Sequence, residues 1–311
     1  MHIKNHEEAL FRASSLIQSS VFKDFLKLDI NRCNFISSWL KDKNIPHSIV
    51  EIAGKKHIIV RYASKYYSSE FKTKTLTAHY DREENTQGAN DNSAACFQLM
   101  YFAEKLLTEK KVHNIKIIFT DGEEAGAEGV VNQGAYSLGV GLKKLNMDKD
   151  DIFVFDMCGR GDTLVFSQSG IIGRDKIKTR GLEDLHRRSF SYAEKAGIKK
   201  KLSMLTAYSD NAGFIAAGLY AQVITILPES EASILFYNLP KNINCLSEAK
   251  SKTASHELAD YVIKNKKPPK DSPFASIIPG TWQLMHTPAD TFEKLTPEAF
   301  VLIEKYLSAI I

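Results

Sequence analysis

The chain has 311 residues, of which 43% are hydrophobic, so it can bury a large core. Its 41 basic and 37 acidic residues leave a net charge of +4, and the lysine-rich stretches are short and far apart, which does not indicate a nucleic-acid or membrane partner. No run approaches the roughly 18 apolar residues of a membrane span, no apolar stretch follows a basic start as in a secretory signal, and the four cysteines form no CxxC pair, so we expect a soluble, cytoplasmic protein with reduced thiols.

The N-terminal part of the chain has the apolar spacing of helices. Between residues 7 and 42 the apolar residues recur at helical intervals, which predicts two amphipathic helices. No repeat, low-complexity stretch or break in composition divides the chain. We therefore expect a single domain over residues 1–311, with residues 1–45 as a helical segment packed on it.

Beyond this segment the pattern alternates between strands and helices. The expected strands span residues 47–52, 56–62, 73–78, 113–120, 152–155, 163–166 and 221–226, the first two forming a hairpin. The expected helices span residues 92–110, 130–142, a stretch capped by Ser209 and ending at Ala217, residues 252–264, and a final helix capped by Thr296 with Pro297 in its first position. This alternation predicts an α/β fold, a three-layer sandwich in which helices cover both faces of a mixed, mostly parallel central sheet.

Five potential metal ligands lie at or beside the ends of hydrophobic runs: His79, Asp91, Glu124, Asp156 and His286. In an α/β sheet, polar groups at the carboxyl ends of strands converge on one crevice. Two neutral imidazoles and three carboxylates form a mixed nitrogen and oxygen set that can hold a pair of zinc ions, with one carboxylate bridging them. We therefore predict a co-catalytic dizinc hydrolase.

Each of these motifs also has a simpler explanation when it is considered alone. Asp91 precedes a helix and could be its N-cap. Asp156 could form an ion pair with Arg160, which is near it in sequence. The adjacent Glu123 and Glu124 could belong to a charged surface turn.

Two further carboxylates accompany the potential ligands as candidate catalytic residues. Asp81 projects to the same side as His79 if the strand continues, so it can accept the second ring N–H and strengthen the imidazole as a ligand. Glu123 and Glu124 point apart, so one can bind metal while its neighbour takes a proton from water. Asp290 could hydrogen-bond His286 or cap the following turn, and we expect a structural role for it.

The order of these motifs resembles metallopeptidase family 28, the bacterial leucyl aminopeptidase type. The motifs are His79-x-Asp81, Gly88-Ala89-Asn90-Asp91-Asn92, Glu123-Glu124-x-Gly126, Asp156-Met157-x-Gly159, Ser209-Asp210 and His286-Thr287-x-x-Asp290-Thr291. The resemblance runs from about residue 75 to the C-terminus. It implies that His79 and Asp156 hold one zinc, that Glu124 and His286 hold the second, and that Asp91 bridges both. It also implies that Glu123 is the general base of an aminopeptidase that removes the first residue of a peptide with a free N-terminus.

The chain departs from the family pattern where substrate contacts are expected. Asn211 and Ala212 follow Ser209-Asp210, where the family often has His and Pro, and Met285 stands where a Tyr often precedes the last ligand. Met157, Phe214 and Met285 are candidates for lining the substrate pocket.

Two other functions are compatible with the same motifs. One is a single-zinc glutaminyl cyclase, which forms N-terminal pyroglutamate, and the other is a non-catalytic binding protein on the same fold. Cobalt or manganese could replace zinc, because carboxylate-rich sites discriminate poorly between these metals. The sequence does not indicate an oligomeric state.

Overall fold

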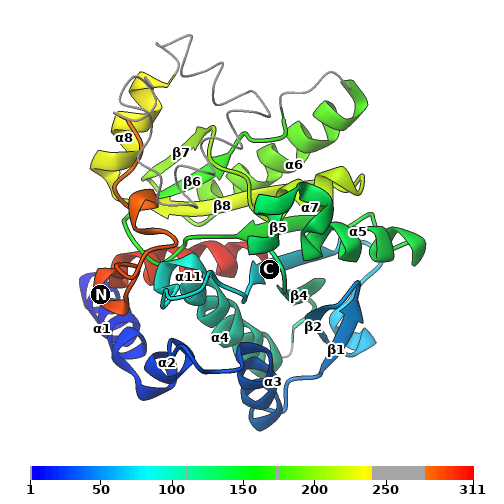
Figure 1. Ribbon diagram of the computed structural model, residues 1–311, viewed down its shortest axis with the longest axis horizontal. Helices are drawn as coiled ribbons and strands as arrows, with labels where there is room; N and C mark the ends of the chain where they lie inside the picture. Colours follow the sequence, from blue (N-terminus) through cyan, green and yellow to red (C-terminus); the bar gives the residue numbers. More distant parts are fainter. Residues whose placement is uncertain (1, 110, 172–175, 240–276) are drawn as a thin grey trace.

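The computed structural model describes residues 2–109, 111–171, 176–239 and 277–311. In these residues an eight-stranded sheet lies between two layers of helices (Figure 1), with the strand order β1-β2-β4-β3-β5-β8-β6-β7. The strands are β1 (His47–Ile52), β2 (Lys55–Arg61), β3 (Lys74–His79), β4 (Ile115–Thr120), β5 (Asp151–Phe155), β6 (Thr163–Ser167), β7 (Lys201–Met204) and β8 (Ala221–Leu227). Strand β3 runs parallel to β4 and β5, β8 runs parallel to β5, and β6 runs parallel to β7, whereas the β1–β2, β2–β4 and β6–β8 pairs are antiparallel. The predicted mixed, mostly parallel sheet is therefore confirmed.

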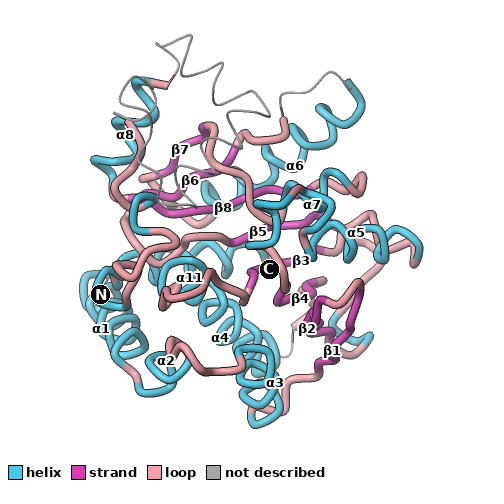
Figure 2. The backbone as a smooth tube through the Cα atoms, viewed as in Figure 1, coloured by secondary structure: helices cyan, strands magenta, loops and turns pink. Residues whose placement is uncertain are grey.

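The helices cover both faces of this sheet (Figures 1 and 2). They are α1 (His2–Gln18), α2 (Ser20–Phe25), α3 (Arg32–Asp42), α4 (Ala94–Glu109), α5 (Gly134–Lys144), α6 (Lys176–Lys195), α7 (Asn211–Ala216), α8 (Glu229–Asn238) and α11 (Pro297–Ile310). Helices α4, α6 and α11 pack on one face, and α5, α7 and α8 pack on the other. This is the three-layer sandwich that the alternating pattern predicts.

The central strands are buried on both faces because both faces are covered. In β5, Phe153 and Phe155 belong to the core under α4 and α11, whereas Ile152 and Val154 belong to the core under α5 and α7. The alternation follows from the two-residue period of a strand. All four side chains are buried, and each contributes about 1.5–3 kcal/mol of hydrophobic stabilisation.

The N-terminal segment contains three helices, so the prediction of two is wrong. Ser19 starts a separate helix α2, because its Oγ accepts a hydrogen bond from Phe22 N at 3.1 Å. Phe22 and Phe25 then pack on Phe97 of α4, with ring centroids 4.8 and 5.3 Å apart. Helix α1 packs on α11. The segment therefore shares its hydrophobic core with the helices that cover the sheet.

Several local predictions are confirmed, and one cap is corrected. The expected hairpin joins β1 to β2 through Ala53 and Gly54, whose φ angles of 51° and 77° are those of a type I′ turn. Ser209 does not cap helix α7, which follows Asp210 and begins at Asn211 without a side-chain cap. The helix expected over residues 252–264 lies outside the described residues. Helices α6 and α8 and strand β7 were not predicted.

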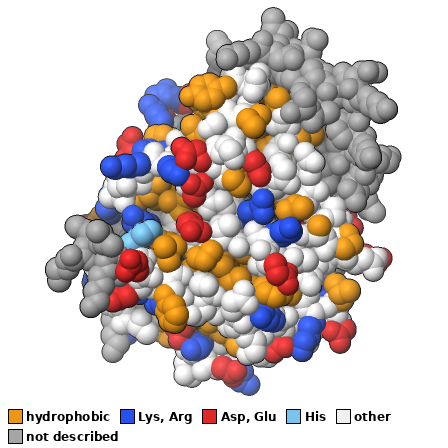
Figure 3. All heavy atoms as spheres, turned by 90° about the vertical axis from the view of Figure 1, so that its left-hand side faces the viewer, with side chains coloured by type: hydrophobic (Ala, Val, Ile, Leu, Met, Phe, Trp, Pro, Cys, Tyr) orange, Lys and Arg blue, Asp and Glu red, His pale blue; other side chains and the backbone are white. Residues whose placement is uncertain are grey.

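The surface has charges of both signs. On the face shown in Figure 3, basic and acidic side chains are interspersed among apolar ones, so the small basic excess does not gather in one patch there. In the described part of the chain, no helix has the length and apolar character needed to cross a membrane.

Candidate metal centre

The five potential ligands come from five segments that meet at one edge of the sheet. His79 is the last residue of β3, Asp156 directly follows β5, and Glu124 lies in the loop that leaves β4. Because β3 runs parallel to both neighbours, the carboxyl ends of these strands lie side by side. Asp91 lies in the irregular turn η2 (Ala89–Ser93) before α4, and His286 lies in the loop after the short helix η5 (Trp282–Leu284).

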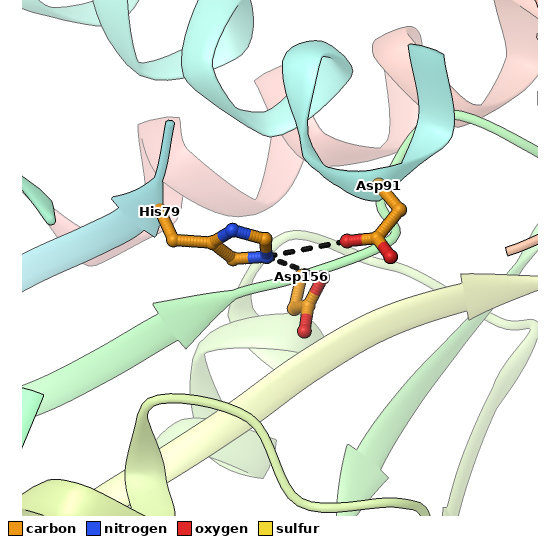
Figure 4. Close-up of side chains that lie close together, drawn as sticks. All are labelled: His79, Asp91 and Asp156. Carbon is orange, nitrogen blue, oxygen red and sulfur yellow. Dashed lines mark ion pairs between the residues drawn. The ribbon is translucent and has the colours of Figure 1, made fainter. Parts of the chain in front are cut away.

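Asp91 lies between the two histidines and faces each with a different oxygen. Its Oδ1 is 3.2 Å from His79 Nε2, and its Oδ2 is 2.9 Å from His286 Nε2. Asp156 Oδ1 approaches His79 Nε2 at 3.6 Å (Figure 4), and Glu124 Oε2 approaches His286 Nε2 at 3.1 Å. The geometry therefore consists of two half-sites, each with one imidazole and one carboxylate, joined by a shared carboxylate.

The chemistry of these residues fits a bound metal. The side chain of His79 is only 1% exposed, and its Nε2, which lies within ion-pair distance of Asp91 and Asp156, makes no hydrogen bond in the part of the chain that the structure describes. Asp156 Oδ1 and Glu124 Oε1 are also buried atoms that make no hydrogen bond in the described residues. A buried polar atom without a partner costs about 1–3 kcal/mol, and zinc accepts imidazole nitrogens and carboxylate oxygens as ligands.

Arg160 does not neutralise Asp156. Its Nε donates to Thr281 Oγ1 at 3.0 Å, and its Nη2 lies 3.8 Å from Glu231 Oε1. The simple ion pair between Arg160 and Asp156 is therefore absent from the described residues.

The acidic and basic groups of the centre shift one another's pKa. Burial lowers the pKa of His286, but its hydrogen bonds to Asp91 and Glu124 outweigh burial and raise it to about 12. Burial, reinforced by the negative charge of Asp91, raises the pKa of Glu124 to about 7. Burial also opposes the charge on His79, but three neighbouring carboxylates raise its pKa well above the ordinary value. In the metal-free protein, the protonated histidines thus neutralise part of the negative charge of the carboxylates, which a bound cation could neutralise instead.

Asp81 and Asp290 contact the rings or the backbone of the candidate ligands. Asp81 Oδ1 lies 3.5 Å from His79 Nδ1, and its Oδ2 accepts a hydrogen bond from Glu124 N at 3.1 Å. Asp290 accepts hydrogen bonds from Asn90 N at 2.9 Å and Asp91 N at 3.0 Å. Asp290 therefore fixes the backbone of the shared carboxylate, in agreement with its expected structural role.

The two asparagines beside Asp91 connect its turn to the loop that carries Asp156. Asn92 donates through Nδ2 to Phe155 O at 2.8 Å and accepts from Met157 N at 3.2 Å. Asn90 Oδ1 accepts from Gly159 N at 2.8 Å. The sequence motifs predict no role for either side chain, although both flank a candidate ligand.

Glu123 and Glu124 diverge, as expected for neighbours. Glu124 turns towards His286, whereas Glu123 Oε1 accepts a hydrogen bond from Gln133 Nε2 at 3.2 Å. Glu123 nevertheless stays close to the centre, because one potential ligand atom each of His79, Glu123 and Glu124 lie within 4.8 Å of one another. Burial raises the pKa of Glu123 well above its ordinary value.

Two further acidic residues lie at the centre and were not predicted there. A ligand atom of Glu83 lies within 4.8 Å of ligand atoms of Glu124 and His286. Its position in the loop after Asp81 is the only sequence signal for it. Asp210 is fully buried, accepts a hydrogen bond from Thr120 Oγ1 at 2.5 Å, and has its pKa raised to about 7 by burial.

The three candidate pocket residues lie in two different hydrophobic clusters. Met157 and Met285 pack in the cluster that contains Leu205 and Trp282. Met157 directly follows Asp156, and Met285 directly precedes His286. Phe214 is fully buried in the core between α5, α7 and the sheet. Their role as pocket lining remains a prediction.

The fold is that of zinc-dependent exopeptidases. The LapA aminopeptidase of Legionella pneumophila superposes with a TM-score of 0.63 at 13% identity, covering 100% of this chain and 72% of that chain. A Zn-dependent exopeptidase from Parabacteroides distasonis gives 0.60 at 15% identity, covering 98% and 97%, and a glutaminyl cyclase from Porphyromonas gingivalis gives 0.58 at 16% identity, covering 96% and 97%. At these identities the likeness shows the fold alone.

The family is shown by the sequence. The model of peptidase family M28 matches residues 58–311, so the chain belongs to that family, as its motifs predict. A search of the curated proteins finds no significant match. Family membership supports a peptidase acting as a hydrolase.

Proposed function

We propose that the protein is an aminopeptidase that binds two zinc ions and hydrolyses the N-terminal residue from peptides. The arrangement of Asp91 is the observation that carries this proposal. One of its oxygens faces His79 at 3.2 Å and the other faces His286 at 2.9 Å, and each histidine has a second carboxylate of its own. A single metal ion would need only one of these two half-sites.

The ligands divide into two sets around Asp91. His79 and Asp156 would hold one ion, Glu124 and His286 would hold the other, and Asp91 would contact both. When bound, the two metal ions would act as Lewis acids on the scissile carbonyl and make water a nucleophile near neutral pH. Cobalt or manganese could take the place of zinc, because the oxygen-rich ligand set discriminates weakly.

Glu123 would move the proton. It takes a proton from the attacking water and passes it to the amine that leaves, so it acts as base and then as acid. Burial raises the pKa of Glu123 well above its ordinary value, which makes its carboxylate a stronger base. Asp81 serves this chemistry indirectly, because it orients His79.

The substrate would be a peptide with a free N-terminus. Its positively charged amino group is complementary to the carboxylates that surround the centre, and this restricts cleavage to the first residue. Met157, Met285 and Phe214 remain the candidates for contact with the side chain of that residue. We further propose that the chain forms one domain and, from its widely spaced cysteines, that it works in the cytoplasm.

A glutaminyl cyclase is the second candidate, since a cyclase of similar length has the same fold. The zinc-loaded protein is incubated with aminoacyl anilides and, separately, with peptides that begin with Gln. An aminopeptidase releases the aniline and the free N-terminal residue. Formation of pyroglutamyl peptide without release of any residue would refute the proposal.

A further inference from the structure

Arg32, the first residue of α3, is connected to the metal centre although it is far from it in sequence. Its side chain is buried, with 6% of the residue exposed. Nη1 donates to Tyr80 O at 3.0 Å, and Nη2 donates to Gln87 O at 2.7 Å and to Ser93 Oγ at 2.8 Å. These three acceptors lie at the beginning, the middle and the end of the segment that joins β3 to α4.

The same segment carries two of the candidate ligands. Tyr80 directly follows His79, and Ser93 lies two residues after Asp91. Ser93 Oγ also donates to Gly88 O at 2.5 Å, which closes the loop on itself. The guanidinium therefore spans the two ends of a loop whose ends hold one ligand each.

The loop turns tightly at Gly88. Gly88 has a φ of 57°, and a Cβ atom at this position would lie 2.4 Å from Asp91 O and 3.5 Å from Arg32 Nη2. Only glycine fits this turn without strain. Arg32 lies against the tightest point of the loop, where a small shift would move the backbone of Asp91.

Arg32 forms no direct ion pair in the described residues, although the negative charges of Asp81 and Asp91 favour its protonated form. In the described residues its guanidinium donates to two carbonyls and a hydroxyl, and it packs over the ring of Phe25 at 4.7 Å. Burial lowers the pKa of Arg32 to about 10, so it remains protonated at neutral pH. A buried charge is costly, and a positive charge near a cation site would by itself weaken cation binding. The contacts of Arg32 instead indicate that it stabilises the loop of residues 80–93.

We propose that Arg32 is a positioning residue of the metal centre, whose guanidinium fixes His79 and Asp91 relative to each other through the loop between them. The inference rests on the proposed function, because it takes these two residues as ligands. Helix α3 lies before residue 58, where the family match begins. A part of the chain outside the matched residues thus helps to build the site.

The test compares Arg32→Met and Arg32→Lys with a matched control, Arg188→Met. Arg188 also uses a guanidinium to hold a buried group, since its Nε and Nη2 contact the two oxygens of Asp151 at 2.7 Å each. Asp151 begins β5, whereas Asp156 follows its other end, so the control lies at the opposite edge of the sheet. Zinc dissociation constants are measured by competition with a chelator, on variants whose metal-free form is folded by circular dichroism.

We expect Arg32→Met to bind zinc about 10–100-fold more weakly than the wild type, the usual effect of removing a group that orients ligands. Arg32→Lys keeps the charge but cannot reach three separated acceptors, so it should also bind more weakly. It carries the test if Arg32→Met does not fold. Arg188→Met should lose thermal stability and keep its zinc affinity.

A second readout needs no metal. In the metal-free proteins, amide hydrogen exchange over residues 80–93 should be faster in the Arg32 variants than in the wild type and in Arg188→Met. Unchanged or tighter zinc binding in the Arg32 variants would overturn the inference, as would an equal loss of affinity in Arg188→Met. Failure of the wild type to bind zinc would instead refute the proposed function, and the exchange measurement would still report whether Arg32 holds the loop.

Discussion

Replacing Glu123 by Gln separates proton transfer from metal binding. The two side chains have nearly the same shape, and the hydrogen bond from Gln133 can be retained, because the amide oxygen can accept it as the carboxylate does at 3.2 Å. Glu123 makes none of the close histidine contacts that define the two half-sites. We therefore expect the variant to fold, to keep both metal ions and to lose the base.

The expected loss follows from the role of the residue. A general base contributes about 10²–10⁴-fold to the rate, which corresponds to roughly 2.7–5.5 kcal/mol at about 1.36 kcal/mol for each factor of ten. We expect kcat for an aminoacyl anilide to decrease by about 10²–10⁴-fold. We also expect the dialysed variant to retain two zinc ions per chain, as measured by plasma mass spectrometry.

The neighbouring residue supplies the matched control. Glu124 Oε2 lies 3.1 Å from His286 Nε2, so Glu124→Gln replaces an anionic ligand by a neutral group. This variant should lose zinc from that half-site. If Glu123→Gln keeps full activity, or if it loses zinc as Glu124→Gln does, the assignment of the two carboxylates is wrong. Unchanged activity would also favour a non-catalytic role for Glu123.

Four further outcomes are expected. Burial raises the pKa of Glu124 and Asp210 to about 7, so between about pH 4 and 7 the native metal-free protein keeps protons that the unfolded chain has released, and its stability falls as the pH rises. The pKa of His286 is raised to about 12 by its carboxylate partners, so this group also makes stability fall as the pH rises above about 6.5. The melting temperature in the presence of a chelator should therefore be lower at about pH 8 than at about pH 5. A higher melting temperature at about pH 8 would contradict this. Replacing Asp290 by Ala frees the backbone of the shared carboxylate and should weaken zinc binding about 10–100-fold in a chelator competition, whereas an unchanged affinity would exclude its positioning role. Chelation should abolish hydrolysis and zinc, cobalt or manganese should restore it, while activity that survives complete metal removal would refute a metal mechanism. Met285→Ala should change the preference among N-terminal residues without changing the zinc content, and an identical preference profile would remove Met285 from the pocket.

The convergence of the ligands could be predicted from sequence because strands place them. Strand β3 ends at His79, and the apolar run of β5 ends just before Asp156, so a parallel pairing of the two strands brings both side chains to one edge. Apolar content marks β5 clearly, since this strand is buried on both faces. The weaker elements lacked this signal: β7 has four residues, three of them only half-buried.

The long-range contacts that support the ligands could not be predicted in the same way. Asp290 holds the backbone of Asn90 across 200 positions of sequence, and Arg32 reaches Ser93 across 61. Such contacts depend on how loops pack in three dimensions, and no local periodicity reports them. Glu83 was missed for the same reason, because its approach to His286 depends on the path of the loop after β3.

The most direct test of the central claim is a crystal structure of the zinc-loaded protein with anomalous data collected at the zinc edge. The two half-sites predict two zinc peaks, about 3.5–4 Å apart as in other two-metal sites. One peak should lie beside His79 and Asp156, the other beside Glu124 and His286, with Asp91 between them. A single peak, or two peaks that do not share Asp91, would contradict the proposed dizinc centre.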